Sequence, residues 1–124
     1  MYQYNAKITN VVDGDTFDMD IDLGFYTHIH VRTRLLEVDT PEKRGSKEKE
    51  LGLIVTEYAS KLLTGKNVVI ESKGLDQSPN TDSFGRWLVK VYLDSESLAE
   101  TYNKLGVNKL NASYSVENVT KLVS

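Results

Sequence analysis

Two carboxylates and a hydroxyl end the apolar run within Arg34–Glu42, where a buried strand would normally continue with further hydrophobic residues. Asp39 and Glu42 can lie inside a protein only beside a cation, an arginine or backbone donors. Pro41 fixes its own φ and favours an extended Thr40, so the chain carries these acids away from the strand on a rigid path. The segment therefore predicts a partner for the acids, with an ordinary strand end followed by an Asx or Ser/Thr turn as the simpler alternative.

A second acidic segment, Asp-Gly-Asp-Thr at residues 13–16, lies between two predicted strands. Residues 17–23 alternate apolar and acidic side chains, which places the apolar set in the core and the acids in water. The same alternation places Asp13 and Asp15 on the inward side. An inward Asp15 needs a partner, and Asp39 is the nearest other acid whose position is unexplained.

Other polar residues in this region have two interpretations each. The outward aspartates Asp18, Asp20 and Asp22 suit a solvated strand face that discourages edge pairing, or, less simply, a calcium site. His28 and His30 share one face of the next strand. They form an exposed pair, or an H-x-H metal site that would still need a third ligand.

Two arginines stand at strand ends near these acids. Arg34 is either a structural partner for a carboxylate or a bidentate clamp for a phosphate group. Arg86 follows a glycine at the start of another strand, where a backbone can approach a ligand, although by itself it could be an ordinary surface arginine. The loop Lys43–Glu50 carries both signs of charge. It could help to hold a polyanion, or be a solvated loop.

The elements that must position these residues follow from periodicity and turn signals. Apolar spacing predicts a helix from Leu51 to Leu62 that ends near Gly65, and Ser97 with Glu100 forms a capping box for a second helix ending at Gly106. A short last helix is expected after residue 114. Strands are predicted at residues 7–12, 17–23, 26–36, 67–72 and 87–93. This order predicts an α+β, mainly β fold: a five-stranded OB-type barrel with two to three helices.

Composition limits the remaining possibilities. The 124 residues suit one domain, 1–124, and the 40% hydrophobic content can supply one core. The formal charge of −3 does not indicate a nucleic-acid binder, so any such role needs a local patch. The chain has no cysteine and hence no disulfide. Its first residues resemble no signal peptide and no apolar run reaches membrane-spanning length, so we expect no membrane association, and the cellular location stays open.

Three motifs lie in order along these predicted elements. Residues 13–16 match D-G-D-T, residues 34–42 match R-L-L-x-V-D-T-P-E, and residues 82–86 match D-x-[YF]-G-R. On these motifs the chain resembles the staphylococcal nuclease family, the thermonucleases, from Lys7 to about Tyr114. One such motif alone would be weak evidence, but three in register with the predicted strands are specific.

The resemblance implies a calcium-dependent nuclease that hydrolyses phosphodiester bonds of DNA and RNA. In the family's pattern the ion is held by Asp15, Asp39 and the main-chain carbonyl of Thr40, and Asp13 supports these ligands. Glu42 positions or deprotonates the attacking water. Several hard oxygen ligands in irregular geometry are what calcium prefers, which agrees with these residue types.

The resemblance also implies the contacts with substrate. Arg34 and Arg86 would grip the phosphate, and Tyr114 would pack against a bound nucleotide of single-stranded or denatured DNA or RNA. The chain departs from the family's pattern at Ser83 and Ala112, in its acidic net charge and in a longer segment between Asp15 and Arg34. We expect a monomer. The alternative is a non-catalytic barrel of the same fold that binds single strands or a protein partner, although such a domain would be expected to lose the acids first.

Overall fold

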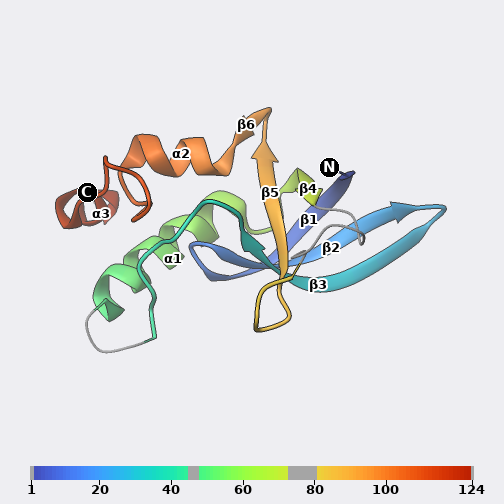
Figure 1. Cartoon of the computed structure of the whole chain (residues 1–124), viewed down its shortest axis with the longest axis horizontal. Coiled ribbons are helices and arrows are strands. Elements are labelled where there is room, and N and C mark those ends of the chain that lie inside the picture. Colours follow the sequence, from blue (N-terminus) through green and yellow to red (C-terminus); the bar gives the residue numbers. More distant parts are fainter. Residues whose placement is uncertain (1, 45–47, 73–80, 124) are drawn as a thin grey trace.

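The computed structural model describes residues 2–44, 48–72 and 81–123 of the chain. Strands form one half of the molecule and helices gather at the other end (Figure 1). In chain order the elements are β1 (Tyr2–Asp13), β2 (Thr16–Gly24), β3 (Thr27–Leu35), α1 (Lys49–Leu63), β4 (Asn67–Ser72), β5 (Trp87–Leu93), β6 (Glu96–Ser97), α2 (Leu98–Leu105), α3 (Val116–Thr120) and a 3-10 helix (Lys121–Val123).

Five of the strands close into a ring. The sheet order is β3-β2-β1-β4-β5-β6, and its neighbours pair antiparallel. A parallel pairing of β3 with β5, through Arg34 opposite Leu88, closes the ring and leaves β6 outside it. Closing a sheet in this way leaves β3 and β5 without free edges where they pair. The predicted mainly-β α+β barrel is therefore confirmed.

Alternation along β2 places the apolar residues in the core. Phe17, Met19 and Ile21 are buried, and the aspartates between them face outward. Two of those aspartates have partners on β3: Asp18 pairs with Arg32 at 2.8 Å, and Asp20 with His28 at 2.9 Å. The described residues contain no group of three or more His, Cys, Asp or Glu side chains that could hold a metal ion. The ion pairs of Asp18 and Asp20 agree with the interpretation of a solvated strand face.

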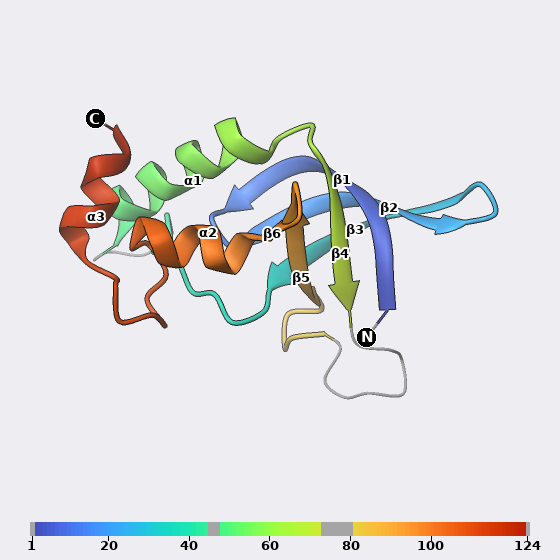
Figure 2. The ribbon, with the colours of Figure 1, turned by 90° about the horizontal axis from the view of Figure 1, so that it is seen from above.

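Local signals in the sequence set the ends of the helices. The Ser97 hydroxyl accepts a hydrogen bond from the Glu100 N–H at 3.1 Å, which confirms the predicted cap of α2. The helix ends at Gly106, whose φ of 75° is left-handed and suits glycine. Figure 2 shows α3 at the end of the molecule, beside α1, and residues 106–115 connect it to α2. We call residues 106–115 the connector.

Pairing between distant segments extended the strands beyond their predicted limits. β1 begins at Tyr2 and not at Lys7, because its first half pairs with β4 from Tyr2 opposite Ser72 to Lys7 opposite Asn67. The short strand β6 was not predicted, and it exists through its pairing with β5. Most of the predicted polar loop at 73–83 lies outside the described residues. None of the described helices is long and apolar enough to cross a membrane.

The β2–β3 hairpin reaches out beyond the other strands (Figures 1 and 2). Its turn contains Phe25 and Tyr26, which are fully exposed and have φ angles of 54° and 60°. Left-handed backbone at two aromatic residues is unusual, and Gly24 beside them has a φ of 85°. The other end of the same hairpin, where Thr16 pairs with Arg34, lies at the candidate site.

Candidate active site

Asp15 lies in the tight turn that joins β1 to β2, and only 5% of it is exposed. Its Oδ1 accepts a hydrogen bond from the Thr16 hydroxyl at 3.1 Å, and its Oδ2 accepts one from the Thr40 N–H at 3.1 Å. The Asp15 carbonyl accepts from the Leu35 N–H at 2.9 Å. The buried carboxylate is thus attached to the two segments that the sequence analysis singled out, as expected from the cost of burying it without partners.

Gly14 lets this turn lie close to the residues after β3. A Cβ at this position would lie 2.5 Å from Val55 Cγ1 and 2.7 Å from the Thr40 hydroxyl oxygen. Such distances exclude any side chain without a shift of the neighbouring groups. The contact brings the D-G-D-T turn and the Asp39–Thr40 segment together, although 25 residues separate Asp15 from Thr40.

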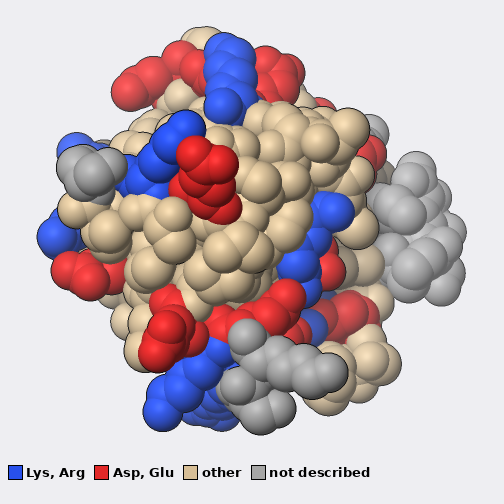
Figure 3. Space-filling view, turned by 90° about the vertical axis from the view of Figure 1, so that its left-hand side faces the viewer, with Lys and Arg blue, Asp and Glu red and all other residues tan. Residues whose placement is uncertain are grey.

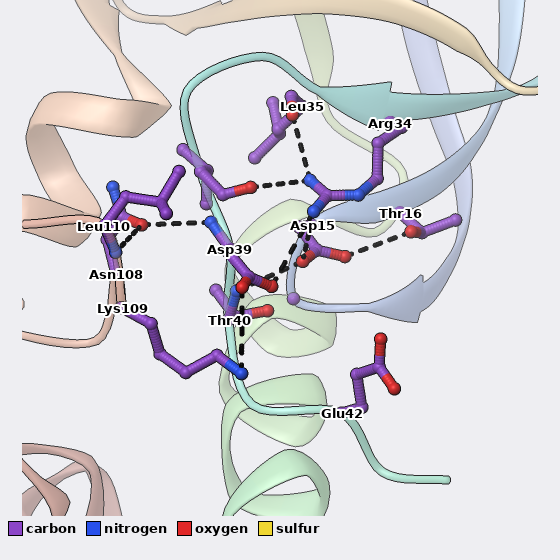
Figure 4. Close-up of polar contacts among 12 residues, drawn as sticks. Asp15, Thr16, Arg34, Leu35, Asp39, Thr40, Glu42, Asn108, Lys109 and Leu110 are labelled. Carbon is purple, nitrogen blue, oxygen red and sulfur yellow. Dashed lines mark hydrogen bonds and ion pairs between the residues drawn. The ribbon is translucent and has the colours of Figure 1, made fainter. Parts of the chain in front are cut away.

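Arg34 joins the two acidic segments, as Figure 4 shows. Its Nη2 lies 3.5 Å from Asp15 Oδ2 and 3.7 Å from Asp39 Oδ1. Its Nη1 donates to the carbonyls of Leu35 at 2.9 Å and Val38 at 2.6 Å. In the structure Arg34 is a partner of two carboxylates, which is one of the two interpretations given for it above. The same guanidinium also lines an open groove, described below.

Arg86 lies beside the Asp15 turn and not across the barrel from it. Its Nη1 donates to the Thr16 hydroxyl at 3.3 Å, and that hydroxyl donates to Asp15. Asp82 fixes the arginine through Nε at 2.6 Å and through its backbone N–H at 2.9 Å. Burial opposes the ionised form of Asp82, but these hydrogen bonds outweigh it and lower the pKa of the carboxyl. The guanidinium carbon lies 5.1 Å from the centre of the Phe84 ring.

The side chain of Glu42 is exposed. Figure 4 shows it near Asp15 and Thr40, with no contact drawn to the other labelled residues. Its backbone N–H donates to Glu48 Oε2 at 3.4 Å. Glu48 in turn accepts hydrogen bonds from Lys109 Nζ at 3.0 Å on both oxygens. An exposed carboxylate on a backbone held in this way is available to a water molecule.

Asp13 is half-buried and lies close to Asp15. It accepts a hydrogen bond from the backbone of Lys43, and its Oδ1 has no hydrogen-bond partner among the described residues. Burial and the negative charge of Asp15 raise the pKa of Asp13. The carboxyl therefore stands in a position that a nearby cation would stabilise in its charged form.

The donor set around Asp15 fits a calcium ion. Two carboxylates, Asp15 and Asp39, and the carbonyl of Thr40 are hard oxygen donors, which calcium combines with water and substrate oxygens. The Thr40 hydroxyl oxygen is buried without a partner among the described residues, as is Asp13 Oδ1. A hydrated cation held by Asp15 and Asp39 would supply a partner for such buried oxygens.

A groove of about 340 Å³ passes both arginines. Arg34 and Arg86 line it together with Asp82 and with apolar residues, namely Leu35, Leu36, Val38, Phe84, Leu88 and Leu110. Tyr114 does not line this groove. It is half-buried against the core, and burial with the charge of Glu48 raises the pKa of its phenol. A larger groove, of about 880 Å³, lies elsewhere, along β1, β4 and the β2–β3 hairpin, and touches none of the expected site residues.

The sequence analysis missed Asn108 and Lys109, which contact the Asp39 segment from the connector. Asn108 Oδ1 accepts from the Asp39 N–H at 3.0 Å, and the Lys109 N–H donates to the Asp39 carbonyl at 2.7 Å. Lys109 Nζ lies 3.7 Å from Asp39 Oδ2. No periodic pattern reports a contact across 69 residues of sequence. A polar Asn-Lys pair two residues after the helix-ending Gly106 is the one local signal that could have drawn attention.

Comparison with known proteins agrees with the fold and these motifs. The family model of staphylococcal nuclease homologues matches residues 32–122, and the chain belongs to this family. An uncharacterised protein of Bacillus anthracis is 31% identical over 103 residues, which cover 82% of this chain and 44% of that protein. Endonuclease YncB of Bacillus subtilis is 29% identical over 121 residues, covering 96% of this chain and 53% of the relative. An uncharacterised protein of Methanocaldococcus jannaschii is 28% identical over 119 residues, with coverage of 82% and 54%. The chain thus spans about half the length of these curated relatives.

Proposed function

We propose that this chain is a calcium-dependent nuclease domain that hydrolyses phosphodiester bonds of DNA and RNA. The observation that supports this most is that Arg34, which lines one groove together with Arg86, also lies 3.5 Å from a carboxylate oxygen of Asp15 and 3.7 Å from one of Asp39. In this mechanism one phosphate group must reach both guanidinium groups and the metal site at the same time. The name of the relative endonuclease YncB supports the same class of reaction.

Each residue has a separate task in this proposal. Asp15, Asp39 and the Thr40 carbonyl hold calcium, which, when bound, polarises the phosphate and offsets its charge. Glu42 accepts a proton from the attacking water on its exposed carboxylate, and it must stay ionised to do so. Arg34 and Arg86 donate N–H groups to the phosphate oxygens, where negative charge increases during attack. Asp13 supports the metal ligands.

Local groups and not the overall charge would recognise the substrate. On the face shown in Figure 3, acidic and basic side chains lie next to one another around an uncharged area. Apolar residues of the groove, among them Phe84 and Leu110, are exposed and could pack against bases of a single strand. We therefore propose single-stranded or denatured DNA and RNA as substrates. Tyr114 remains a predicted nucleotide contact, and a single domain over residues 1–124 acting as a monomer remains a prediction.

A cleavage assay tests the proposal. Purified protein is incubated with denatured DNA and with RNA, in millimolar calcium and in chelator, beside the variant Glu42→Gln. We expect cleavage that requires calcium and falls by roughly 10²–10⁴ in the variant, with strand binding retained. Strand binding without cleavage at any calcium concentration would favour the non-catalytic binding module. Cleavage that is equal in wild type and variant would assign the activity to another protein in the preparation.

A further inference from the structure

Asn108 is a buried amide whose polar atoms all have partners, and two of those partners lie in the segment that contains Asp39. The residue is 2% exposed and lies on the connector. Its Oδ1 accepts from the N–H groups of Asp39 at 3.0 Å and Leu110 at 3.1 Å. Its Nδ2 donates to the carbonyl of Glu37 at 3.1 Å and to Asn103 Oδ1 at 2.9 Å. Burying an amide is costly unless it is hydrogen-bonded in this way.

The connector forms hydrogen bonds with both backbone polar groups of Asp39, the N–H and the carbonyl. The Asn108 side-chain oxygen accepts from the N–H of Asp39 (Figure 4), and the backbone N–H of Lys109 donates to the Asp39 carbonyl at 2.7 Å. Residues 36–44 belong to no helix or strand, so no ladder of backbone hydrogen bonds fixes them. The position of the Asp39 backbone therefore depends on the connector and on neighbouring contacts such as that of Arg34 with the Val38 carbonyl.

Glu37, two residues before Asp39, adds a second reason for this support. Its φ of 63° is left-handed, a conformation that is strained for a residue other than glycine. Such a backbone persists where its surroundings hold it, and Asn108 Nδ2 holds the Glu37 carbonyl. Asn108 thus stabilises the bend that directs Asp39 towards Arg34.

We infer that Asn108 is a positioning residue for calcium binding: it acts through the backbone of Asp39 and does not touch the ion or the substrate. The inference rests on the proposed function of Asp39 as a calcium ligand. Residues that orient metal ligands typically contribute 10–100-fold in metal affinity or activity. A purely structural role for Asn108 would lower the melting temperature and leave the calcium affinity unchanged.

The test compares Asn108→Ala with a matched control, Asn118→Ala. Asn118 is also an asparagine that holds a connector carbonyl, that of Ser113 at 2.9 Å, but it has no hydrogen bond to the site. Calcium affinity is measured by calorimetry, and hydrogen exchange of the Asp39 amide is measured in the calcium-free protein. We expect Asn108→Ala to weaken calcium binding 10–100-fold and to speed exchange at Asp39, while Asn118→Ala does neither.

A second variant keeps the test decisive if Asn108→Ala unfolds. Asn108→Ser adds no buried charge, retains a hydroxyl acceptor on the side of the Asp39 N–H and loses the donor to Glu37, so its calcium affinity should fall less than that of Asn108→Ala. Unchanged calcium affinity in folded Asn108 variants, with a wild type that binds calcium, would overturn the inference alone. A wild type that binds no calcium would overturn the proposed function, and with it this inference.

Discussion

Lys109 Nζ donates hydrogen bonds of 3.0 Å to both carboxylate oxygens of Glu48, which links the connector to the residue directly before α1. Burial disfavours the charge of Lys109, but the Glu48 hydrogen bonds and the charge of Asp39 outweigh it and raise the pKa of the lysine. The same pair lowers the pKa of Glu48. Glu48 also accepts a hydrogen bond from the Glu42 backbone N–H, so this ion pair contacts both Asp39, the proposed calcium ligand, and the backbone of Glu42, the proposed base.

Replacing Lys109 by Met should therefore change calcium binding and turnover in opposite directions. Loss of a positive charge 3.7 Å from Asp39 should strengthen calcium binding a few-fold, because two unit charges at about 4 Å in water interact by about 1 kcal/mol. Turnover should fall, because Glu48 no longer holds the backbone of Glu42. Calcium calorimetry and the maximal cleavage rate measure the two effects.

Lys104→Met is the matched control for this variant. Lys104 forms a comparable ion pair with Glu96 at 3.0 Å, but both side chains are largely exposed and neither contacts the site. Exposed pairs of this kind contribute little to stability. Weaker calcium binding in Lys109→Met than in Lys104→Met would show that Lys109 does not compete with the ion.

Asp13→Asn should stabilise the calcium-free protein at neutral pH. Because the pKa of Asp13 is raised in the fold, its contribution to stability is fully present below the unfolded value of 3.8 and is lost as the pH rises through the folded pKa. Asparagine does not ionise, so the variant does not lose this stability as the pH rises. Carboxylates with lowered pKa, such as Glu48 and Asp82, change stability in the opposite sense, so the difference between wild type and variant is the quantity to follow.

Melting temperatures from pH 3 to pH 7 check this sign. Without calcium, we expect the variant to gain on the wild type as the pH rises. Saturating calcium supplies the cation that the ionised Asp13 needs, so the gain should shrink. A gain that is constant over this pH range would mean that the effect has nothing to do with the ionisation of Asp13.

Arg86→Lys should lower the cleavage rate strongly while weak substrate binding survives. Lysine keeps the positive charge but cannot make the fork of contacts that Arg86 makes with Asp82 and Thr16. In arginine-assisted phosphoryl transfer the arginine contributes on the order of 10³–10⁵ in rate, which sets the scale here. Rates with saturating substrate and strand binding at fixed salt and calcium separate the two effects. An equal loss in rate and in binding would show that Arg86 binds the ground state and not the transition state.

Sequence reasoning succeeded where a local rule controls the structure. Alternation along β2 identified the inward and outward sides, and the cap at Ser97 and the left-handed Gly106 gave the ends of α2. The order of the strands along the chain and the turn at Gly14 beside Asp15 were predicted by the same kind of local rule. These features depend on neighbouring residues, so the sequence displays them directly.

Contacts across the chain could not be predicted in this way. The first half of β1 exists because β4 pairs with it, and the Asp39 backbone is held by Asn108, which is 69 residues away. Asn108 looks from the sequence like an ordinary turn residue after a helix. Its burial and its contacts become visible only when the connector packs against the segment after β3.

Tyr102→Phe should destabilise the fold through the turn that carries Asp15. The hydroxyl of fully buried Tyr102 donates to the Gly14 carbonyl at 2.6 Å, and burial raises the pKa of the phenol, so it stays a donor. Without it, a buried carbonyl loses its partner, which costs about 1–3 kcal/mol. Tyr92→Phe is the control, because the Tyr92 hydroxyl bonds Glu71 nearer the surface. Urea unfolding should show a loss in Tyr102→Phe that exceeds the loss in the control, and equal losses would contradict a stabilising role for this bond.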